Sequence, residues 1–402
     1  MKNKYQGISK TKIRILCISP DLPYPPDQGC KVDIWGHISF FHNIGAEVIL
    51  VLCKSAETRN PDTYEHRFPI KMDFHFVPRS HPWNSSENPE TVSQIQNLVN
   101  SYKPNIIWCE YAHFSSLVSQ LNLYQAKLWF RPHNFELAHA IDKILAERPW
   151  HTWSGLKGLN QALSWTRHNI KFLRNIYLKE KLMHQISDHL FFISYKDLKI
   201  MSKIYRKSIP KDWVLPFLES YVIPVKPNKT CLDIIYIGGV GTKNTPNMIG
   251  ARLLLNEIIP AVKKQLSHAF RFHLVGRGLS RKFEEYSSNS VFIHDYISDL
   301  EGFLNDMDIA CVPVNVGWGC KIKMIEALAS GLPTVGAREA FRGVPDTTGA
   351  YFSCNVIQDY VEAFEALQSY KVREEISAGA RTAYLNWIES GQQSLESAIN
   401  SL

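Results

Sequence analysis

Short apolar runs recur along the first half of the chain, separated by segments long enough to form helices. They occupy residues 13–19, 48–53, 74–77, 106–111, 127–131 and 189–194. Runs that are apolar at consecutive positions are typical of parallel strands covered by helices on both faces. The pattern therefore predicts a doubly wound α/β sheet.

A second series of the same kind follows the proline-containing stretch at residues 216–230. Single cores rarely grow beyond about 250 to 300 residues, so a chain of 402 residues favours two domains. We expect two Rossmann-like domains in tandem, over residues 1–220 and 221–373. The second series of runs lies at residues 233–239, 270–276, 291–294, 308–314, 332–337 and 350–353.

A long amphipathic helix is predicted between Leu156 and His184, where apolar residues recur at steps of three, four and seven. The stretch holds six Lys and Arg residues from Lys157 to Lys181 against one acid, Glu180. Such a face fits a helix packed on its own domain with a solvated basic surface. The alternative is a surface that contacts anionic lipid or a phosphate-linked acceptor.

Composition indicates a folded globular protein, with 45% hydrophobic and 21% charged residues. Eight scattered cysteines without a CxxC pair are typical of buried thiols in a reducing compartment. No apolar run of about 18 residues is present, so we expect a cytoplasmic protein, with peripheral contact to the inner membrane surface as an option. The net charge of +7 is not gathered in Lys/Arg-rich runs; it suits a phosphate-bearing ligand or a membrane surface and gives no reason to expect nucleic acid.

Candidate chemistry concentrates at residues 314–337, where a strand leads through Gly317-Trp318-Gly319 into a helix expected from about Lys321 to Ser330. Backbone N–H groups at a helix start and the positive end of its dipole form a phosphate site. Lys321 would add a cation there, and Glu326, one turn deeper, could accept hydrogen bonds from ribose hydroxyls. Alternatively, the glycines only make a tight turn, and Glu326 is a surface carboxylate paired with Lys323.

This strand–loop–helix segment closely resembles the retaining GT-B glycosyltransferases of family four, also described as glycosyl transferases group 1. In that family a stretch of this pattern binds the sugar nucleotide, and many members have a glutamate that binds the donor sugar where this chain has Trp318. The resemblance implies two Rossmann-like domains facing a central cleft. The matching residues are Gly317, Gly319, Lys321, Lys323, Glu326, Ala327, Ala329, Gly331 and Pro333.

Other stretches are similar to the same family over nearly the whole chain. Residues 13–41 resemble its first strand, acceptor-side glycine loop and first helix, which makes Asp27 and Gly29 acceptor-side candidates. Residues 131–136 resemble its histidine motif, in which His133 would face the donor sugar. Residues 374–402 resemble its final helices, which cross back to the N-terminal domain. The family's opening of the donor lobe and its phosphate-binding cations imply roles for Gly238, Gly239, Lys243, Gly276, Arg277 and Arg342.

What the resemblance implies is transfer of a sugar from a nucleotide diphosphate sugar to an acceptor hydroxyl with retention of configuration. His133, Lys321 and Glu326 would be the catalytic residues; the acceptor would be a glycan, a lipid-linked intermediate or a small molecule. UDP is among the candidate nucleotides, and polysaccharide biosynthesis among the candidate settings. Alternatives are a sugar-nucleotide-binding protein with weak or no activity, an epimerase or a phosphorylase.

No metal or cofactor is required on this interpretation. Asp306-Met307-Asp308 forms a DxD pattern, which holds a divalent metal in other glycosyltransferases. Here it precedes a buried strand, where the resemblance places a structural aspartate. Three pairs of histidines also lack the spacing and supporting ligands of a zinc site. They are His37 with His42, His133 with His139, and His184 with His189.

Overall fold

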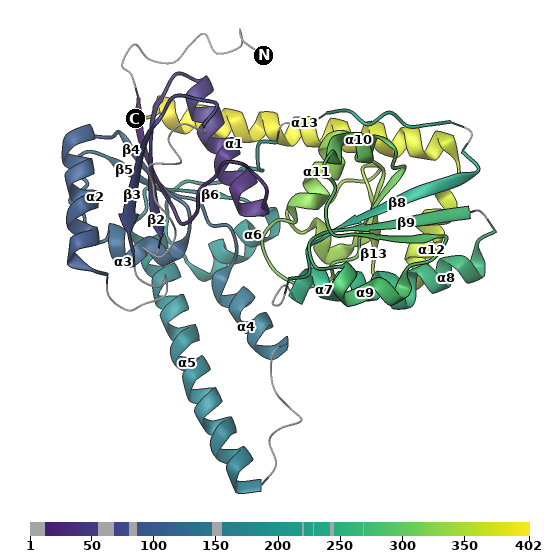
Figure 1. Ribbon diagram of the computed structural model, residues 1–402. Helices are drawn as coiled ribbons and strands as arrows, with labels where there is room; N and C mark the ends of the chain where they lie inside the picture. The colour runs from purple at the N-terminus through teal and green to yellow at the C-terminus, as the bar shows by residue number, and fades with distance from the viewer. Residues whose placement is uncertain are drawn as a thin grey trace. The chain divides into compact units, whose positions relative to one another are not determined.

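The computed structural model divides into two compact units (Figure 1). One consists of Met1–Phe217 together with Ser390–Leu402, and the other of Leu218–Glu389. The structure describes residues 13–54, 68–79, 87–146, 155–218, 221–227, 229–241, 245–267 and 269–402.

The first unit is built on a seven-stranded parallel sheet with the order β3-β2-β1-β4-β5-β6-β7. Six strands lie where the apolar runs predicted them. The seventh, β7, was missed because its three residues, Lys-Asp-Trp, are only half-buried and show no apolar run. The strands are β1 (Arg14–Ser19), β2 (Glu47–Lys54), β3 (Asp73–Pro78), β4 (Ile106–Cys109), β5 (Lys127–Phe130), β6 (His189–Phe192) and β7 (Lys211–Trp213).

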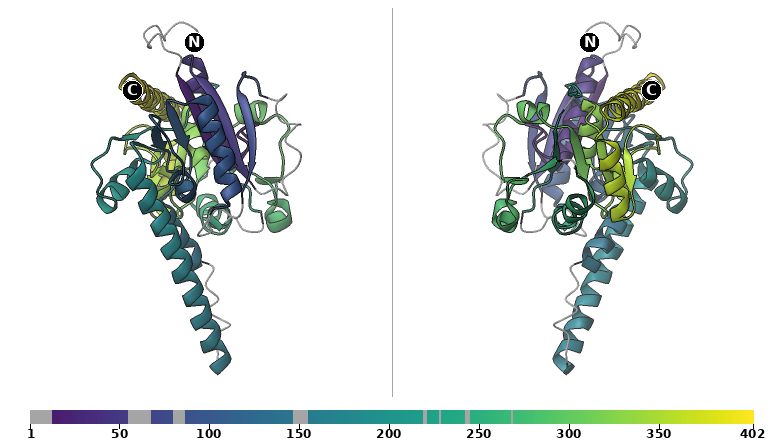
Figure 2. Two further views of the ribbon diagram at one scale, coloured as in Figure 1. Left: turned by 90° about the vertical axis from the view of Figure 1, so that its left-hand side faces the viewer. Right: turned by 90° about the vertical axis from the view of Figure 1, so that its right-hand side faces the viewer.

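Helices cover this sheet (Figure 2). Large aromatic side chains fill the space between the layers. Trp108 stacks on Phe191, with ring centroids 5.4 Å apart, and Leu395 and Ile399 near the C-terminus pack into the same core. The helices are α1 (Gly29–Asn43), α2 (Pro89–Tyr102), the 3₁₀ turn η3 (Ala112–Phe114), α3 (Ser115–Val118), α4 (Glu136–Ala146), α5 (Gly155–Ile186) and α6 (Tyr195–Ile204).

The second unit repeats the arrangement with a six-stranded parallel sheet of order β10-β9-β8-β11-β12-β13. Read in chain order, both sheets follow the 3-2-1-4-5-6 strand order of the Rossmann fold. The expected pair of Rossmann-like sheets is therefore confirmed. The strands are β8 (Cys231–Ile237), β9 (Ala269–Val275), β10 (Val291–His294), β11 (Ile309–Val312), β12 (Thr334–Ala337) and β13 (Phe352–Cys354).

Among the helices of this unit, α11 begins one residue later than expected and ends at Ser330. The next residue, Gly331, is the C-cap and adopts the left-handed conformation, with φ of +75°. Where several final helices were expected, Tyr370–Asn400 form one helix, α13. The remaining elements are α7 (Thr245–Leu253), the π-helical η5 (Leu254–Ile258), α8 (Ile259–Gln265), α9 (Ser280–Phe283), η6 (Glu284–Tyr286), α10 (Leu300–Asn305), α11 (Ile322–Ser330), η7 (Arg338–Phe341) and α12 (Ile357–Ala366).

The sequence also led us to expect buried thiols and no membrane-spanning helix. All eight cysteines are free thiols, and five of them are buried. Within the described ranges, no helix combines the length and the apolar character needed to cross a bilayer.

The long helix α5 runs away from the sheet of its unit, with α4 beside it (Figure 1). Glu180 on α5 caps the start of α4: its carboxylate accepts hydrogen bonds from the N–H groups of Glu136 (2.7 Å) and Leu137 (3.2 Å). Tyr205 donates a third hydrogen bond to it at 3.0 Å. Because Glu180 is only 1% exposed, these donors replace water as its solvation.

Glu180 is expected to make the stability of the first unit depend on pH. Burial, with the charge of Glu136 adding to it, raises the pKa of Glu180 from 4.5 to about 8. Between these values the folded chain holds a proton that the unfolded chain has lost, so the free energy of unfolding falls as pH rises from about 5 to 8. In Glu180→Gln, the decrease in the free energy of unfolding over this pH range should be smaller by roughly 1 to 3 kcal/mol.

Urea denaturation of both proteins at several pH values across this window measures the difference. The exposed Glu285→Gln serves as a control and should reproduce the pH dependence of the parent protein. A parallel pH dependence in Glu180→Gln and the parent would show that this carboxyl does not cause it.

Candidate functional site

In the second unit, the loops that follow β8 and β9 meet backbone to backbone. A Cβ atom on Gly276 would lie 2.5 Å from the carbonyl carbon of Gly238, so only glycine permits this approach. Val240 N–H donates to the carbonyl of Arg277 at 2.9 Å, and the backbone at Gly239 lies next to Arg277. The structure thus brings Gly238, Gly239, Gly276 and Arg277 together at the carboxyl ends of two parallel strands, where open α/β sheets bind their ligands.

The loop between β11 and α11 turns through two left-handed glycines, Gly317 (φ +87°) and Gly319 (φ +75°). Lys321 is the N-cap residue of α11, and its Nζ donates to the carbonyl oxygen of Trp318 at 3.2 Å. A Cβ on Gly317 would lie 3.3 Å from that Nζ. Glycine at 317 therefore leaves room for the ammonium group to lie over its own loop, next to the first turn of the helix.

A second cation reaches the same loop from the chain after β12. The Arg342 guanidinium lies 4.0 Å from the centroid of the Trp318 ring, a cation–π contact. Its Nη1 also donates to Glu339 at 2.6 Å, and the side chain is nearly buried. Trp318 therefore presents a ring with a positive charge over it, at the position where the family resemblance leads one to expect a glutamate.

Glu326 forms the ion pair with Lys323 that the sequence suggests, and it also lines a cavity of the second unit. Its Oε2 pairs with Lys323 at 2.8 Å, with both side chains about one-third exposed. It also lines a cavity of about 160 Å³, where it is the one carboxylate among the described lining residues. The phosphate-side candidates Gly317, Gly319 and Lys321 do not line this cavity. The lining residues are Leu218, Tyr221, Ile235, Ile237, Leu300, Leu304, Ala310, Cys311, Val312, Lys323, Glu326, Ala327, Ala329, Ser330 and Leu332.

The DxD pattern makes structural contacts. Asp308 is buried and accepts hydrogen bonds from Lys229 Nζ (2.5 Å) and from the N–H of Asp233 (2.8 Å). Asp306 pairs with Lys226 at 2.9 Å on the surface. The two carboxylates thus join the start of β11 to β8 and to the segment before it.

In the first unit, a fully buried ion pair joins α1 to the residue after β5. Arg131 donates from Nε to Asp33 Oδ2 (3.0 Å) and from Nη2 to Asp33 Oδ1 (2.6 Å). Its Nη1 donates to the carbonyls of Phe191 (3.2 Å) and Val214 (2.7 Å). Burial alone would raise the pKa of Asp33, but the charge and hydrogen bonds of Arg131, together with the neighbouring His37 and His133, lower that pKa to about 2.

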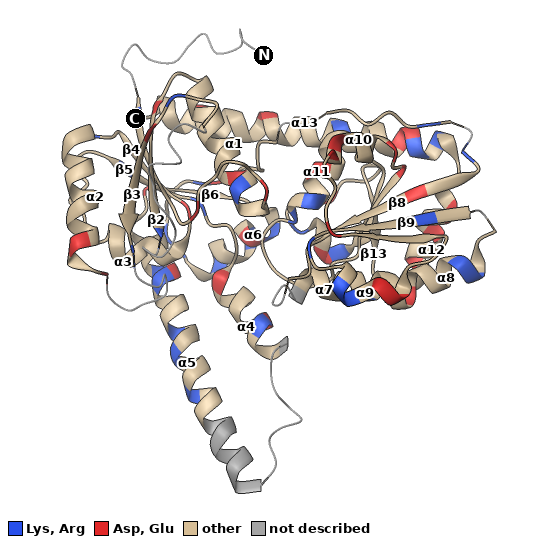
Figure 3. Cartoon of the chain, in the orientation of Figure 1, with Lys and Arg blue, Asp and Glu red and all other residues tan. Residues whose placement is uncertain are grey.

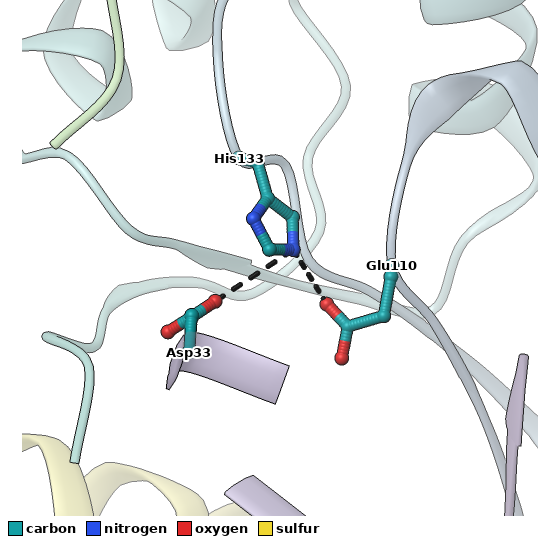
Figure 4. Close-up of side chains that lie close together, drawn as sticks. All are labelled: Asp33, Glu110 and His133. Carbon is teal, nitrogen blue, oxygen red and sulfur yellow. Dashed lines mark hydrogen bonds and ion pairs between the residues drawn. The ribbon is translucent and has the colours of Figure 1, made fainter. Parts of the chain in front are cut away.

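His133, two residues later, points its Nε2 at two carboxylates (Figure 4). Nε2 lies 2.7 Å from Glu110 Oε2 and 3.6 Å from Asp33. The other oxygen of Glu110 accepts from Trp108 Nε1 at 2.6 Å, and the Tyr111 ring stacks on the imidazole at 4.2 Å. Because a carboxylate can only accept, Nε2 must carry a proton. The imidazole is thereby fixed, with Nδ1 on the side of the ring away from Glu110.

Asp33, Glu110 and His133 also offer three ligand atoms within 4.8 Å of one another, which is close enough to hold a metal ion. The hydrogen bonds already present compete with that use. Arg131 occupies both oxygens of Asp33, and Trp108 and His133 occupy one oxygen each of Glu110. A cation would have to displace the proton on Nε2 and crowd the buried guanidinium, so the donor set fits a proton-bridged network better than a metal site.

Three other candidates complete the comparison with the sequence. Asp27 is exposed and pairs with Lys31 at 2.8 Å, and Gly29 begins α1 after the carboxyl end of β1. Lys243 falls outside the described residues. The sequence did not single out Glu110, Asp33 or Arg131, whose partners lie 23 and 98 positions away from them.

Residues 232–369, within the second unit, match the model of the family described as glycosyl transferases group 1. No curated protein matches the chain significantly by sequence.

Solved structures with a similar fold cover nearly the whole chain. Sucrose-phosphate synthase from Thermosynechococcus elongatus is 13% identical with a TM-score of 0.65, over 97% of this chain and 99% of that one. A TarM variant of S. aureus in complex with fondaparinux, α-GlcNAc-glycerol and UDP is 12% identical with a TM-score of 0.65, over 96% and 99%. HepE of Anabaena in complex with UDP and glucose is 12% identical with a TM-score of 0.59, over 97% and 100%. The chain therefore has the GT-B fold, and its second unit carries the sequence pattern of the group 1 glycosyltransferases.

Proposed function

We propose that this protein is a glycosyltransferase that moves a sugar from a nucleotide diphosphate sugar to an acceptor hydroxyl with retention of configuration. The observation that carries the proposal is the loop at residues 317–321, which enters α11 through two left-handed glycines with Lys321 at the helix start. It lies inside the segment that matches the group 1 glycosyltransferases. The TarM and HepE structures are complexes with UDP, which makes UDP sugars the first donors to test.

In this proposal, the leaving diphosphate binds at the start of α11. Free N–H groups of the first turn and the helix dipole favour an anion there. Lys321 supplies a charge in the same loop, Arg342 one beside Trp318, and Arg277 an exposed one from the neighbouring loop. Lys243 remains a candidate fourth cation. Fixed positive groups at this position stabilise the charge that gathers on the diphosphate in the transition state.

Glu326 is proposed to hold the nucleoside. Its Oε2 is paired with Lys323, so Oε1 is the atom that would accept from a ribose hydroxyl. The mostly apolar cavity that it lines can bury uncharged surface of the ligand.

His133 is proposed to orient the donor sugar, and Asp27 and Gly29 to lie on the acceptor side. With Nε2 tied to Glu110, Nδ1 is the imidazole atom available for a substrate hydroxyl. Glu110 is then a positioning residue. No protein nucleophile is needed, because the leaving phosphate can itself take the proton of the acceptor hydroxyl. The acceptor would be a glycan, a lipid-linked intermediate or a small molecule, and the free thiols fit reaction in the cytoplasm.

A sugar-nucleotide-binding protein with weak transfer activity is the second candidate, and the Trp318–Arg342 contact favours it. The indole and guanidinium occupy the position from which many relatives bind the donor sugar by a glutamate. Calorimetry with UDP, GDP, ADP and dTDP sugars, followed by an assay of nucleotide release with and without acceptors, separates the two. Binding without release across the acceptor panel would favour the second candidate, and phosphate-dependent turnover would indicate a phosphorylase.

Removing the charge of Lys321 should weaken binding of the nucleotide. Lys321→Ala is expected to lose roughly 1 to 3 kcal/mol of binding free energy, the scale of a hydrogen bond to a charged group. Lys321→Arg should retain most of it, and the exposed Lys263→Ala on α8 serves as a control. Isothermal titration calorimetry measures the affinities; unchanged affinity in Lys321→Ala would remove this residue from the phosphate site.

Truncation of His133 should affect turnover more than nucleotide affinity. For His133→Ala we expect kcat to fall by roughly 10²-fold, the scale for loss of one positioned polar contact in a transition state. The dissociation constant for the free nucleotide should change little, because the nucleotide lies on the other unit in this proposal. Equal losses in both quantities, or in neither, would contradict the placement of His133 beside the sugar.

Exchange of Glu110 for glutamine should move the imidazole proton of His133. The carbonyl of the introduced amide would accept from the Trp108 N–H, which leaves the amide NH₂ facing His133 Nε2. Because two donors cannot bond each other, Nε2 must become the acceptor and the proton shifts to Nδ1.

Nitrogen chemical shifts of the His133 ring in the ligand-free protein report this tautomer without any assay of activity. Asp212→Asn, which removes the carboxylate 2.6 Å from His189, is the matched control and should leave the His133 signals unchanged. An unaltered Nε2–H tautomer in Glu110→Gln would contradict the positioning role of Glu110.

A further inference from the structure

One face of α5 carries a row of exposed side chains that the proposed reaction does not use. Figure 3 shows Lys and Arg positions recurring along this helix. Arg167, Lys171, Arg174, Leu178 and Lys181 follow one another at steps of four, three, four and three residues. This spacing places them on a single side of a helix. With a rise of 1.5 Å per residue, the row extends over about 21 Å.

The row is strongly positive because the helix offers no exposed carboxylate to balance it. The one acid of α5, Glu180, is buried against the start of α4. Among the residues that the structure describes, none of the four cations in the row forms an ion pair. Lys181 instead lies over the ring of Tyr177, at 5.9 Å.

Apolar side chains are exposed along the same face. Ile170 is 60% exposed and Leu178 is 47% exposed, and Tyr177 lies beside them. Together with Ile141 and Leu145 of α4, they make up five of the twelve exposed large hydrophobic residues in the described part of the chain. Exposure of aliphatic groups is unfavourable in water, so their concentration on this helix pair indicates a surface that is covered in use.

From this combination we infer that α5 docks the first unit on an anionic lipid surface. Lys and Arg bind lipid phosphates while their methylene stems and the neighbouring aliphatic side chains enter the boundary between headgroups and acyl chains. This inference is independent of the proposed sugar transfer, because it concerns a face of α5 that carries none of the candidate site residues.

Other occupants fit the row less well. A second copy of the helix would bring four cations against four cations. The phosphates of a nucleic acid would pair with the cations but leave Ile170 and Leu178 exposed to water. A single phosphate-bearing ligand is too short for a row of about 21 Å.

Sedimentation of the full chain with vesicles tests the inference. Vesicles of phosphatidylcholine with about 30% phosphatidylglycerol should bind the protein at about 50 mM salt and release most of it at about 300 mM, whereas pure phosphatidylcholine should bind little. Reversing the charge of the four cations in the row should weaken binding to the anionic vesicles by at least about 100-fold. The substitutions are Arg167→Glu, Lys171→Glu, Arg174→Glu and Lys181→Glu. Ile170→Ser with Leu178→Ser should weaken it several-fold at unchanged net charge.

The matched control reverses four exposed cations on the second unit, by Lys263→Glu, Lys264→Glu, Arg281→Glu and Lys282→Glu. It changes the net charge by the same amount and should retain most of the vesicle binding. Equal loss in both quadruple variants would reduce the effect to total charge and overturn the inference. So would absence of binding to the anionic vesicles, or tighter binding to duplex DNA that the Ile170 and Leu178 exchanges leave unaffected. Circular dichroism checks folding; if the α5 quadruple variant fails to fold, the aliphatic pair decides alone.

Discussion

The buried pair of Arg131 and Asp33 is the interaction on which the first unit depends. One guanidinium connects α1 with the chain after β5, and through two carbonyls it also holds β6 and the segment after β7. Desolvation of both charges is costly, and only their pairing with further hydrogen bonds offsets it. The arrangement tolerates little movement, because any shift of Arg131 leaves a buried carboxylate unpaired. His133 lies two residues away and inherits this rigidity.

The two units position their candidate groups by different physical means. In the first, charged and aromatic side chains do so: Glu110 fixes the proton of His133, and Tyr111 stacks on its ring. Burial and the Arg131 charge lower the pKa of the adjacent His37 to about 3, so that ring stays neutral, and its Nδ1 donates a hydrogen bond to the backbone carbonyl of Asp33 at 2.8 Å. In the second unit the backbone itself forms the surface, because glycines at 238, 276 and 317 permit close approaches that a Cβ would hinder. A site that must receive a bulky anion is well served by backbone N–H groups, and a site that must hold one proton by side chains.

The sequence predicted most of the fold because strands buried on both faces of a parallel sheet have continuous apolar runs. It failed at β7, where pairing to β6 and not composition makes the strand. It located the loop at 317–321 because that chemistry is local to one turn. Glu110 and Asp33 could not be found in this way, since their significance arises only when folding brings α1 and the ends of β4 and β5 together. The contact of Arg342 with Trp318 is non-local in the same sense, although an aromatic residue between two glycines at a helix start was a visible signal.

The distribution of positive charge around that loop also ranks the cations. Arg277 is exposed, where water weakens its attraction for a phosphate. Arg342 is buried, but the carboxylate of Glu339 at 2.6 Å neutralises much of its charge. Lys321 is half-buried at the start of α11, and its Nζ donates to the carbonyl of Trp318 within the same loop. In the proposed complex, Lys321 is thus the cation at the helix start, and Arg342 would act mainly through Trp318, whose ring it contacts. In the proposed function, Trp318 in place of the expected glutamate would therefore affect how the sugar is held more than how the phosphates are bound.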